Sequence, residues 1–454
     1  MAKLTSTRST RGPHRSKSSS QPKPSHPPQE HSTHRQKRRK QIIRFAAGRV
    51  KHQQWASIAR QTAAIALGDG KYVENLRCSV PAVSSSPIAD SPETSQLQRS
   101  LSTWHVVHDI SSQVRYSNRA TVFYPHDSDV VRSWVTRPAA SSLVAPRRTA
   151  IEFSKYSAVN RSRRLYLDSV ASQKTTPYPI RQTTIGVLTS ASVHRPGGAY
   201  LSGGTEPDAV LARSTSLVAS LSTPEARQFY SEMKKYTKEY GAGFFPHSLV
   251  YSPSIVGFRR DDDDHFNVQD DDFDPELDAI PADPTTAELE LPPAVNAQNQ
   301  RAMGEYVSPY LMNVVSAVPV NANTIRTASS PPPFPSNDST SFSPTSTEIV
   351  EATIRQTVKD RLGRALRLFE LHGDRKLVLG AFGCREGLSV EVVAQIYAEL
   401  LACNVGENGD GRFRDVFEKV VFSLPGKLCA PFRTAFQMRV FDDELNRALD
   451  AVEL

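Results

Sequence analysis

Apolar strand patterns alternate with amphipathic helical patterns through the C-terminal part of this chain, and this alternation restricts the fold more than any other feature. Residues 376–381 and 419–424 are apolar runs of the length typical of buried strands. Between them, Ser389 precedes a helical pattern whose apolar residues share one face. Strands separated by a helix pair in parallel through a right-handed crossover. The pattern therefore predicts an α/β fold.

The same alternation extends toward the N-terminus. Residues 184–188 form a third buried-strand pattern, and shorter strand patterns lie at 104–107, 120–124, 150–153, 248–251 and 312–317. Helical spacing predicts helices at 55–65, which Gly68 would end, and at 159–170, 211–221, 224–240 and 350–369. These elements suffice for one large sheet with helices beside it.

Composition predicts one large domain with low-complexity segments. Hydrophobic residues make up 38% of the 454 residues, below the usual share of about 45–50%, and the chain has 32 prolines. We expect a disordered basic tail over 1–40 and one domain over 41–454. Within that domain we expect insertions near 79–100, 261–300 and 327–346.

The positive charge is concentrated at the N-terminus. The formal net charge is +8, and Glu30 is the only acidic residue among the first forty. A basic tail of this kind predicts contact with nucleic acid or another polyanion. The run at 37–40 fits a nuclear-import cluster and a solvated basic tail equally well.

Cysteine use favours a reducing compartment, in the nucleus or the cytoplasm. The four cysteines are far apart and form no C-x-x-C pair, which argues against a disulfide framework and a cysteine-ligated zinc site. No apolar run is long enough to span a bilayer, and no apolar segment of a secretory signal is present. The acidic runs at 261–264 and 270–272 could bind a divalent cation, but they match no EF-hand loop, so we expect a solvated loop and no metal site. We also expect no cofactor.

Two glycine-bearing turns follow predicted strands. The first, at 197–204, follows the strand at 184–188, and the second, at 380–387, follows the strand at 376–381. Glycine has no Cβ, so backbone amides can come close to an anion or a sugar. Ligands of such sheets bind at the carboxyl ends of strands. The turns predict a ligand site, although tight turns and close packing without a ligand are the alternative.

Several segments, in order along about residues 50–425, resemble the microbial-type poly(ADP-ribose) glycohydrolase domain, a macrodomain relative. They are 58–62 with 70–72, 187–199, 251–259, 316–322, 377–384 and 420–422. The resemblance implies a macrodomain-like three-layer core, with a mixed, largely parallel sheet and helices on both faces. It also implies ADP-ribose or poly(ADP-ribose) as the ligand. The implied ligand-binding residues are Gly197, Gly198, Ala199, Gly203, Asn321, Gly380, Gly383 and Cys384.

One departure from the family pattern bears on catalysis. The family has Gln-Glu-Glu where this chain has Pro207, Asp208 and Ala209. The second glutamate is the family's catalytic acid, and cleavage of the O-glycosidic bond needs such a carboxylic acid. The resemblance therefore implies a protein that binds ADP-ribose with hydrolysis weakened or lost.

Two alternatives stay open at this point. Asp208 or Glu206 could replace the missing acid, which would make the chain an active hydrolase. The place of Asp208 at a helix start favours a capping-box acid paired with Thr205 over a catalytic acid. The other alternative is a nuclear scaffold that holds nucleic acid or a polyanion through its basic tail.

Removing residues 1–40 should abolish salt-dependent polyanion binding. Lysine and arginine that neutralise phosphates release counterions, so a non-specific dissociation constant of about 10⁻⁴–10⁻⁶ M should rise steeply with salt. Fluorescence polarisation with labelled single-stranded nucleic acid, at increasing salt, would compare the full chain with residues 41–454. Binding that survives the deletion, or that ignores salt, would contradict the prediction.

Overall fold

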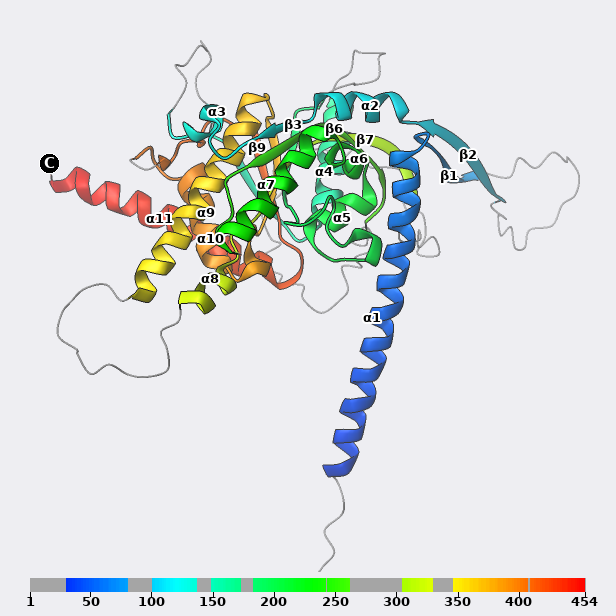
Figure 1. The fold of residues 1–454 in the computed structure, drawn as a ribbon, viewed down its shortest axis with the longest axis horizontal. Helices are drawn as coiled ribbons and strands as arrows, with labels where there is room; N and C mark the ends of the chain where they lie inside the picture. Colours follow the sequence, from blue (N-terminus) through cyan, green and yellow to red (C-terminus); the bar gives the residue numbers. More distant parts are fainter. Residues whose placement is uncertain are drawn as a thin grey trace, which may run out of the picture. The chain divides into compact units, whose positions relative to one another are not determined.

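The computed structural model describes residues 30–80, 100–136, 148–172, 183–241, 243–261, 304–329, 346–406 and 409–453 (Figure 1). The chain divides into residues 1–50 and a compact unit, Lys51–Leu454. Helix α1 (Glu30–Leu67) begins within the predicted tail. The predicted disorder of residues 1–29 and most of the predicted insertions lie outside the described residues, so the predicted domain organisation stays a prediction.

A mixed seven-stranded sheet forms the centre of the compact unit. Its order is β3 (Val122–Tyr124), β6 (Leu249–Arg259), β7 (Tyr306–Ala317), β5 (Ile185–Ser190), β8 (Lys376–Gly380), β9 (Lys419–Ser423) and β4 (Ala150–Ser154). Four neighbouring pairs, from β7 to β4, are parallel. Strand β6 is antiparallel to β3 and β7. The predicted α/β fold with a mixed, largely parallel sheet is confirmed.

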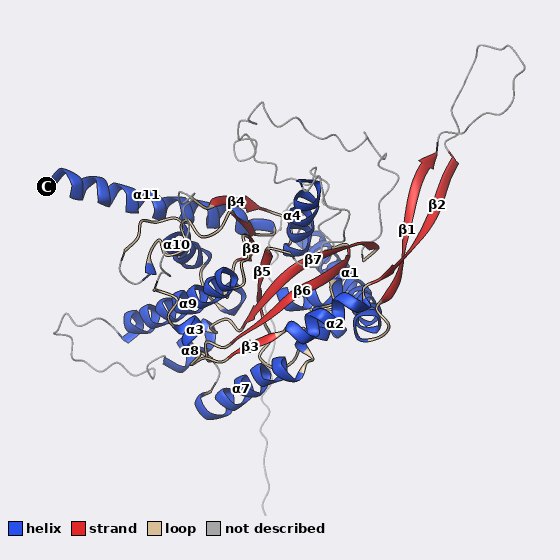
Figure 2. Cartoon of the chain, turned by 90° about the horizontal axis from the view of Figure 1, so that it is seen from above, coloured by secondary structure: helices blue, strands red, loops and turns tan. Residues whose placement is uncertain are grey.

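Helices cover both faces of the sheet (Figure 2). One face packs on α9 (Ser346–Leu371), α10 (Val390–Leu401) and α11 (Cys429–Glu453). The other packs on α4 (Ala158–Ser172), α5 (Pro207–Ser214), α6 (Leu217–Leu221) and α7 (Pro224–Tyr240). Successive strand residues alternate between the two cores: Leu377 and Leu379 point to the first, and Val378 points to the second. The predicted three-layer core is therefore confirmed.

Three shorter helices pack beside these elements. Helix α2 (Ser111–Ala120) packs on β6, and α3 (Asp129–Arg132) and α8 (Ala322–Ser329) pack on α9. A separate antiparallel hairpin consists of β1 (Lys71–Val80) and β2 (Ser100–Asp109). No helix of the described part of the chain is both long and apolar enough to cross a bilayer.

One local prediction is confirmed and one is wrong. Helix α1 ends before Gly68, as predicted, and β1 begins at Lys71 after Gly70 in a left-handed conformation. The predicted single helix at 211–221 is two helices, α5 and α6. Between them the Ser216 N–H donates to the Val256 carbonyl at 2.8 Å, and its hydroxyl accepts from the Val256 N–H at 3.0 Å. Pairing with β6 thus interrupts the helix.

Candidate functional site

Three loops meet where β5, β7 and β8 end, because parallel strands place their carboxyl ends at one edge. They surround a cavity of about 420 Å³. The loop after β5 supplies residues 190–195 and 198–199, and the start of α5 supplies Glu206, Pro207 and Asp208. The remaining lining residues are Phe245, Val318, Pro319, Asn321 and Glu386.

Gly198 lets the first loop close over the start of α5. Its backbone is left-handed, with φ +54°, a conformation that glycine adopts without cost. A Cβ at this position would lie 2.8 Å from Oδ2 of Asp208. The glycine therefore makes room for a carboxyl group at the cavity wall as well as for the turn.

Asp208 is 2% exposed, and its carboxyl already has a main-chain partner. Oδ2 accepts a hydrogen bond from the Ser192 N–H at 2.9 Å. Burial raises the pKa of Asp208 to about 6, although hydrogen bonds from main-chain amides oppose the shift. The carboxyl thus ties the exit of β5 to the start of α5.

The predicted capping box of Thr205 and Asp208 is wrong. Glu206 is the N-cap residue of α5, and its side chain makes no capping bond. The Thr205 hydroxyl instead accepts a hydrogen bond from Arg385 at 2.9 Å, and the Thr205 carbonyl accepts a second one from the same guanidinium at 2.9 Å. Arg385 follows β8, so these bonds join the second glycine turn to the first.

Two further carboxyl groups line the cavity. Oε2 of Glu206 is buried and has no hydrogen-bond partner within the described ranges. Burial raises the pKa of Glu386, and the nearby Glu206 adds to this shift. The sequence prediction missed Glu386, although its place in the second glycine-bearing turn, at 380–387, was a signal for it. Together with Asp208, these groups make the cavity rich in acids.

Ala209 does not face the cavity. It is fully buried against Ala59, Tyr200, Ala212 and Val218. A glutamate at this position would bury its carboxyl among apolar side chains, which is costly. In this chain the acidic residue of α5 that lines the cavity is Asp208.

The predicted ligand-binding residues divide into two groups. Gly198, Ala199 and Asn321 line the cavity, whereas Gly197, Gly203, Gly380, Gly383 and Cys384 do not. Packing explains the clearest cases in the second group. A Cβ on Gly197 would lie 2.8 Å from Ala212, and one on Gly203 would lie 2.1 Å from the His52 carbonyl.

Cys384 is a half-buried free thiol. Burial raises its pKa to about 12, so the thiol stays protonated at neutral pH. No group of three histidine, cysteine or carboxylate side chains in the described part of the chain is arranged to hold a metal ion.

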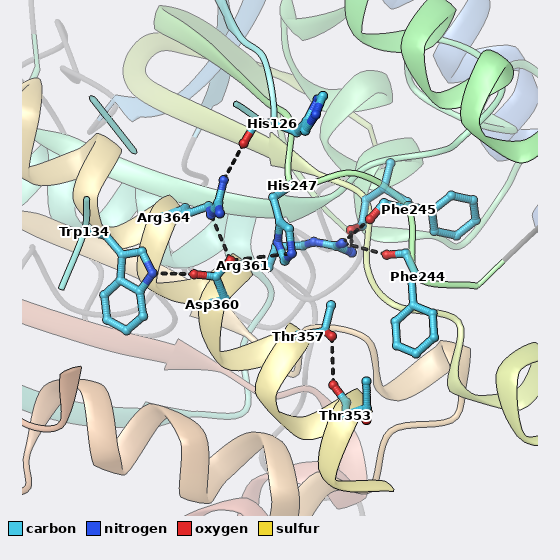
Figure 3. Close-up of polar contacts among 11 residues, drawn as sticks. His126, Trp134, Phe244, Phe245, His247, Thr353, Thr357, Asp360, Arg361 and Arg364 are labelled. Carbon is cyan, nitrogen blue, oxygen red and sulfur yellow. Dashed lines mark hydrogen bonds and ion pairs between the residues drawn. The ribbon is translucent and has the colours of Figure 1, made fainter. Parts of the chain in front are cut away.

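A buried arginine holds the wall that carries Phe245 (Figure 3). Arg361, on α9, is fully buried. It donates to the carbonyls of Val318 at 2.6 Å, Phe244 at 2.6 Å and Phe245 at 2.8 Å. Phe245 has φ +54°, an unfavourable conformation for a residue with a bulky side chain. The guanidinium therefore stabilises a strained turn and joins it to the end of β7.

Replacing Arg361 with methionine should lower the free energy of unfolding by roughly 3 kcal/mol or more. Three buried carbonyls would lose their donor, each at about 1 kcal/mol or more. Urea denaturation would measure the change. Arg375→Met is the matched control, because Arg375 forms an exposed ion pair with Glu418 at 4.0 Å, worth at most about 1 kcal/mol. Equal effects of both substitutions would show that the wall does not depend on Arg361.

Substitution of Asp208 by asparagine should change how stability depends on pH. The folded pKa of about 6 lies above the unfolded value, so the native state keeps a proton that the unfolded chain releases. As pH rises from about 4 to 7, the titration of Asp208 should lower the wild-type free energy of unfolding by about 2–3 kcal/mol. Asparagine can still accept from Ser192 but does not titrate.

Chemical denaturation of both proteins across this pH range tests the prediction. Asp374, whose pKa burial raises to about 7, titrates in both and cancels from the difference. A wild-type-minus-variant difference that does not change with pH would contradict the prediction.

Comparison with known proteins agrees with the resemblance in the sequence. Residues 96–260 match the family model of the microbial-type PARG catalytic domain. The poly(ADP-ribose) glycohydrolase of Thermomonospora curvata is 22% identical with a TM-score of 0.52, over 85% of this chain and 99% of that chain. That of Deinococcus radiodurans, solved with ADP-ribose, is 19% identical with a TM-score of 0.46, over 72% and 96%. Curated proteins give no match.

The glycine loop, Glu206 and Asp208 all lie within the matched residues, and the likeness to the Thermomonospora curvata structure shows a shared fold. The resemblance to the microbial-type poly(ADP-ribose) glycohydrolase family is thus confirmed over residues 96–260.

Proposed function

We propose that this protein binds ADP-ribose in the cavity at the ends of β5, β7 and β8, with O-glycosidic hydrolysis weakened or lost. The family match supports the ligand class, because it spans the loop and the helix start that line much of the cavity. The placement at the carboxyl ends of parallel strands also supports it.

The charges favour a sugar inside the cavity. Glu206, Asp208 and Glu386 outnumber Arg195 in the lining and would repel a diphosphate, whereas carboxyl oxygens accept hydrogen bonds from ribose hydroxyls. A diphosphate fits better beside the second glycine turn, whose Gly383 and Gly387 both have left-handed backbones. In this arrangement the diphosphate lies near the end of β8, and the ligand extends along the sheet edge toward β7, with a ribose in the cavity.

One observation carries the proposed loss of hydrolysis. The position of the family's catalytic glutamate is Ala209, which is fully buried and supplies no carboxyl group to the cavity. The neighbouring Asp208 carboxyl is engaged with the Ser192 amide. General acid catalysis contributes typically 10²–10⁴-fold, so we expect a rate loss of about this size.

A second candidate is an active hydrolase that uses Glu206 as its acid. The buried, unpartnered Oε2 of Glu206 at the cavity favours this alternative. Asp208 is the other candidate acid, since a pKa of about 6 leaves part of its population protonated near neutral pH.

Calorimetric titration with ADP-ribose, together with a poly(ADP-ribose) hydrolysis assay beside the Thermomonospora curvata enzyme, tests the proposal. We expect saturable binding and turnover lower by about 10²–10⁴-fold. Turnover close to that of the reference enzyme and abolished by Glu206→Gln or Asp208→Asn would establish the second candidate. Absence of ADP-ribose binding to the folded wild type would contradict both.

A further inference from the structure

A second cavity, of about 710 Å³, lies between α7 and α9. Its walls include Tyr236 and Tyr240 from α7, and Phe244, Phe245 and His247 from the loop before β6. Thr353 and Thr357 on α9 form part of the opposite side. The described side chains thus surround it with aromatic rings from two separate segments.

The second cavity neighbours the first, because Phe245 lines both. Leu249, at the start of β6, pairs with Ala317, at the end of β7, so the loop before β6 lies at the same sheet edge as the first cavity. The order of strands places the second cavity beyond the first, on the side away from β8.

The aromatic walls suit a planar ring. The rings of Tyr236 and Tyr240 lie 4.8 Å apart at 40°. Tyr240 is 67% exposed, so its ring is accessible to a ligand. Stacking of a nucleobase on such a side chain is worth about 1–3 kcal/mol.

The cationic groups beside α9 are already engaged, and the carboxyl groups of Glu232 and Glu239 outnumber Lys235 in the cavity wall, which disfavours a phosphate in this cavity. Arg361 donates to main-chain carbonyls. Arg364 donates to Asp360 at 2.9 Å and to the His126 carbonyl at 2.6 Å (Figure 3). His247 contacts Asp360 at 3.5 Å, and burial lowers its pKa to about 2, so it carries no charge at neutral pH. The surroundings fit an uncharged ring.

We propose that the second cavity binds the adenine base of a neighbouring unit when the ligand is an ADP-ribose chain rather than a monomer. The inference rests on the proposed function, since it requires a terminal ADP-ribose in the first cavity. Every unit of such a chain carries a base, and the chain must leave the first cavity on one side. The aromatic cavity beyond Phe245 gives the next base a stacking surface on that side.

Affinities for ADP-ribose and for a two-unit ADP-ribose chain test this inference. The wild type should bind the two-unit ligand about 5–150-fold more tightly, which corresponds to 1–3 kcal/mol of stacking. Tyr240→Ala and Phe244→Ala should each remove most of that gain. Phe441→Ala, which removes a 58% exposed aromatic side chain from α11, is the control and should keep the full gain.

The outcomes separate the inference from the proposed function. If the wild type binds ADP-ribose but gains nothing from the second unit, or if both cavity variants keep the gain, the inference is wrong and the proposed function stands. If the folded wild type binds neither ligand, the proposed function itself is wrong. Circular dichroism of each variant shows whether it is folded, and Tyr240→Ala changes an exposed residue that folding does not require.

Discussion

The guanidinium of Arg361 is the interaction on which both cavities depend. It reaches from α9 to three carbonyls, one at the end of β7 and two in the turn before β6. The turn holds Phe245 at a positive φ, and Phe245 forms part of both cavity walls. A buried arginine is costly unless its donors are satisfied. Arg361 can therefore stay buried only while the end of β7 and the turn before β6 keep their carbonyls directed at its guanidinium.

Carboxyl groups give the first cavity its chemical character. Asp208 accepts from the Ser192 amide, Glu206 has a buried oxygen without a partner among the described residues, and Glu386 comes from the second glycine turn. Arg385 brings the two turns together through Thr205. Such a cavity favours hydroxyl groups over phosphates. It lacks a carboxyl at Ala209, so the proposed binding and the proposed loss of hydrolysis arise from the same set of residues.

Much of the fold could be predicted because the central strands are buried on both faces and are therefore continuous apolar runs in the sequence. The strands at 376–381 and 419–424 and the Ser389 cap are confirmed, and Ser389 accepts the Val392 N–H at 3.1 Å. These features arise from neighbouring residues. The break between α5 and α6 could not be predicted, because it arises from hydrogen bonds between Ser216 and Val256, which lie 40 residues apart. Contacts between separate segments also decide which of the predicted glycines line the cavity. Gly198 faces the carboxyl of Asp208, whereas Gly197 faces Ala212.

The sequence by itself determined the α/β class, the family resemblance and the absence of glutamate at position 209. The spacing of apolar residues indicates the fold class, and short motifs in a fixed order indicate the family. Neither signal depends on where a side chain points. Only the tertiary structure decided that Asp208 faces the cavity while Ala209 is buried, that Glu386 joins the site, and that Arg361 holds its wall. Each of these depends on contacts between segments far apart in the chain. Those contacts form only when α5, α9 and the strand ends have packed together.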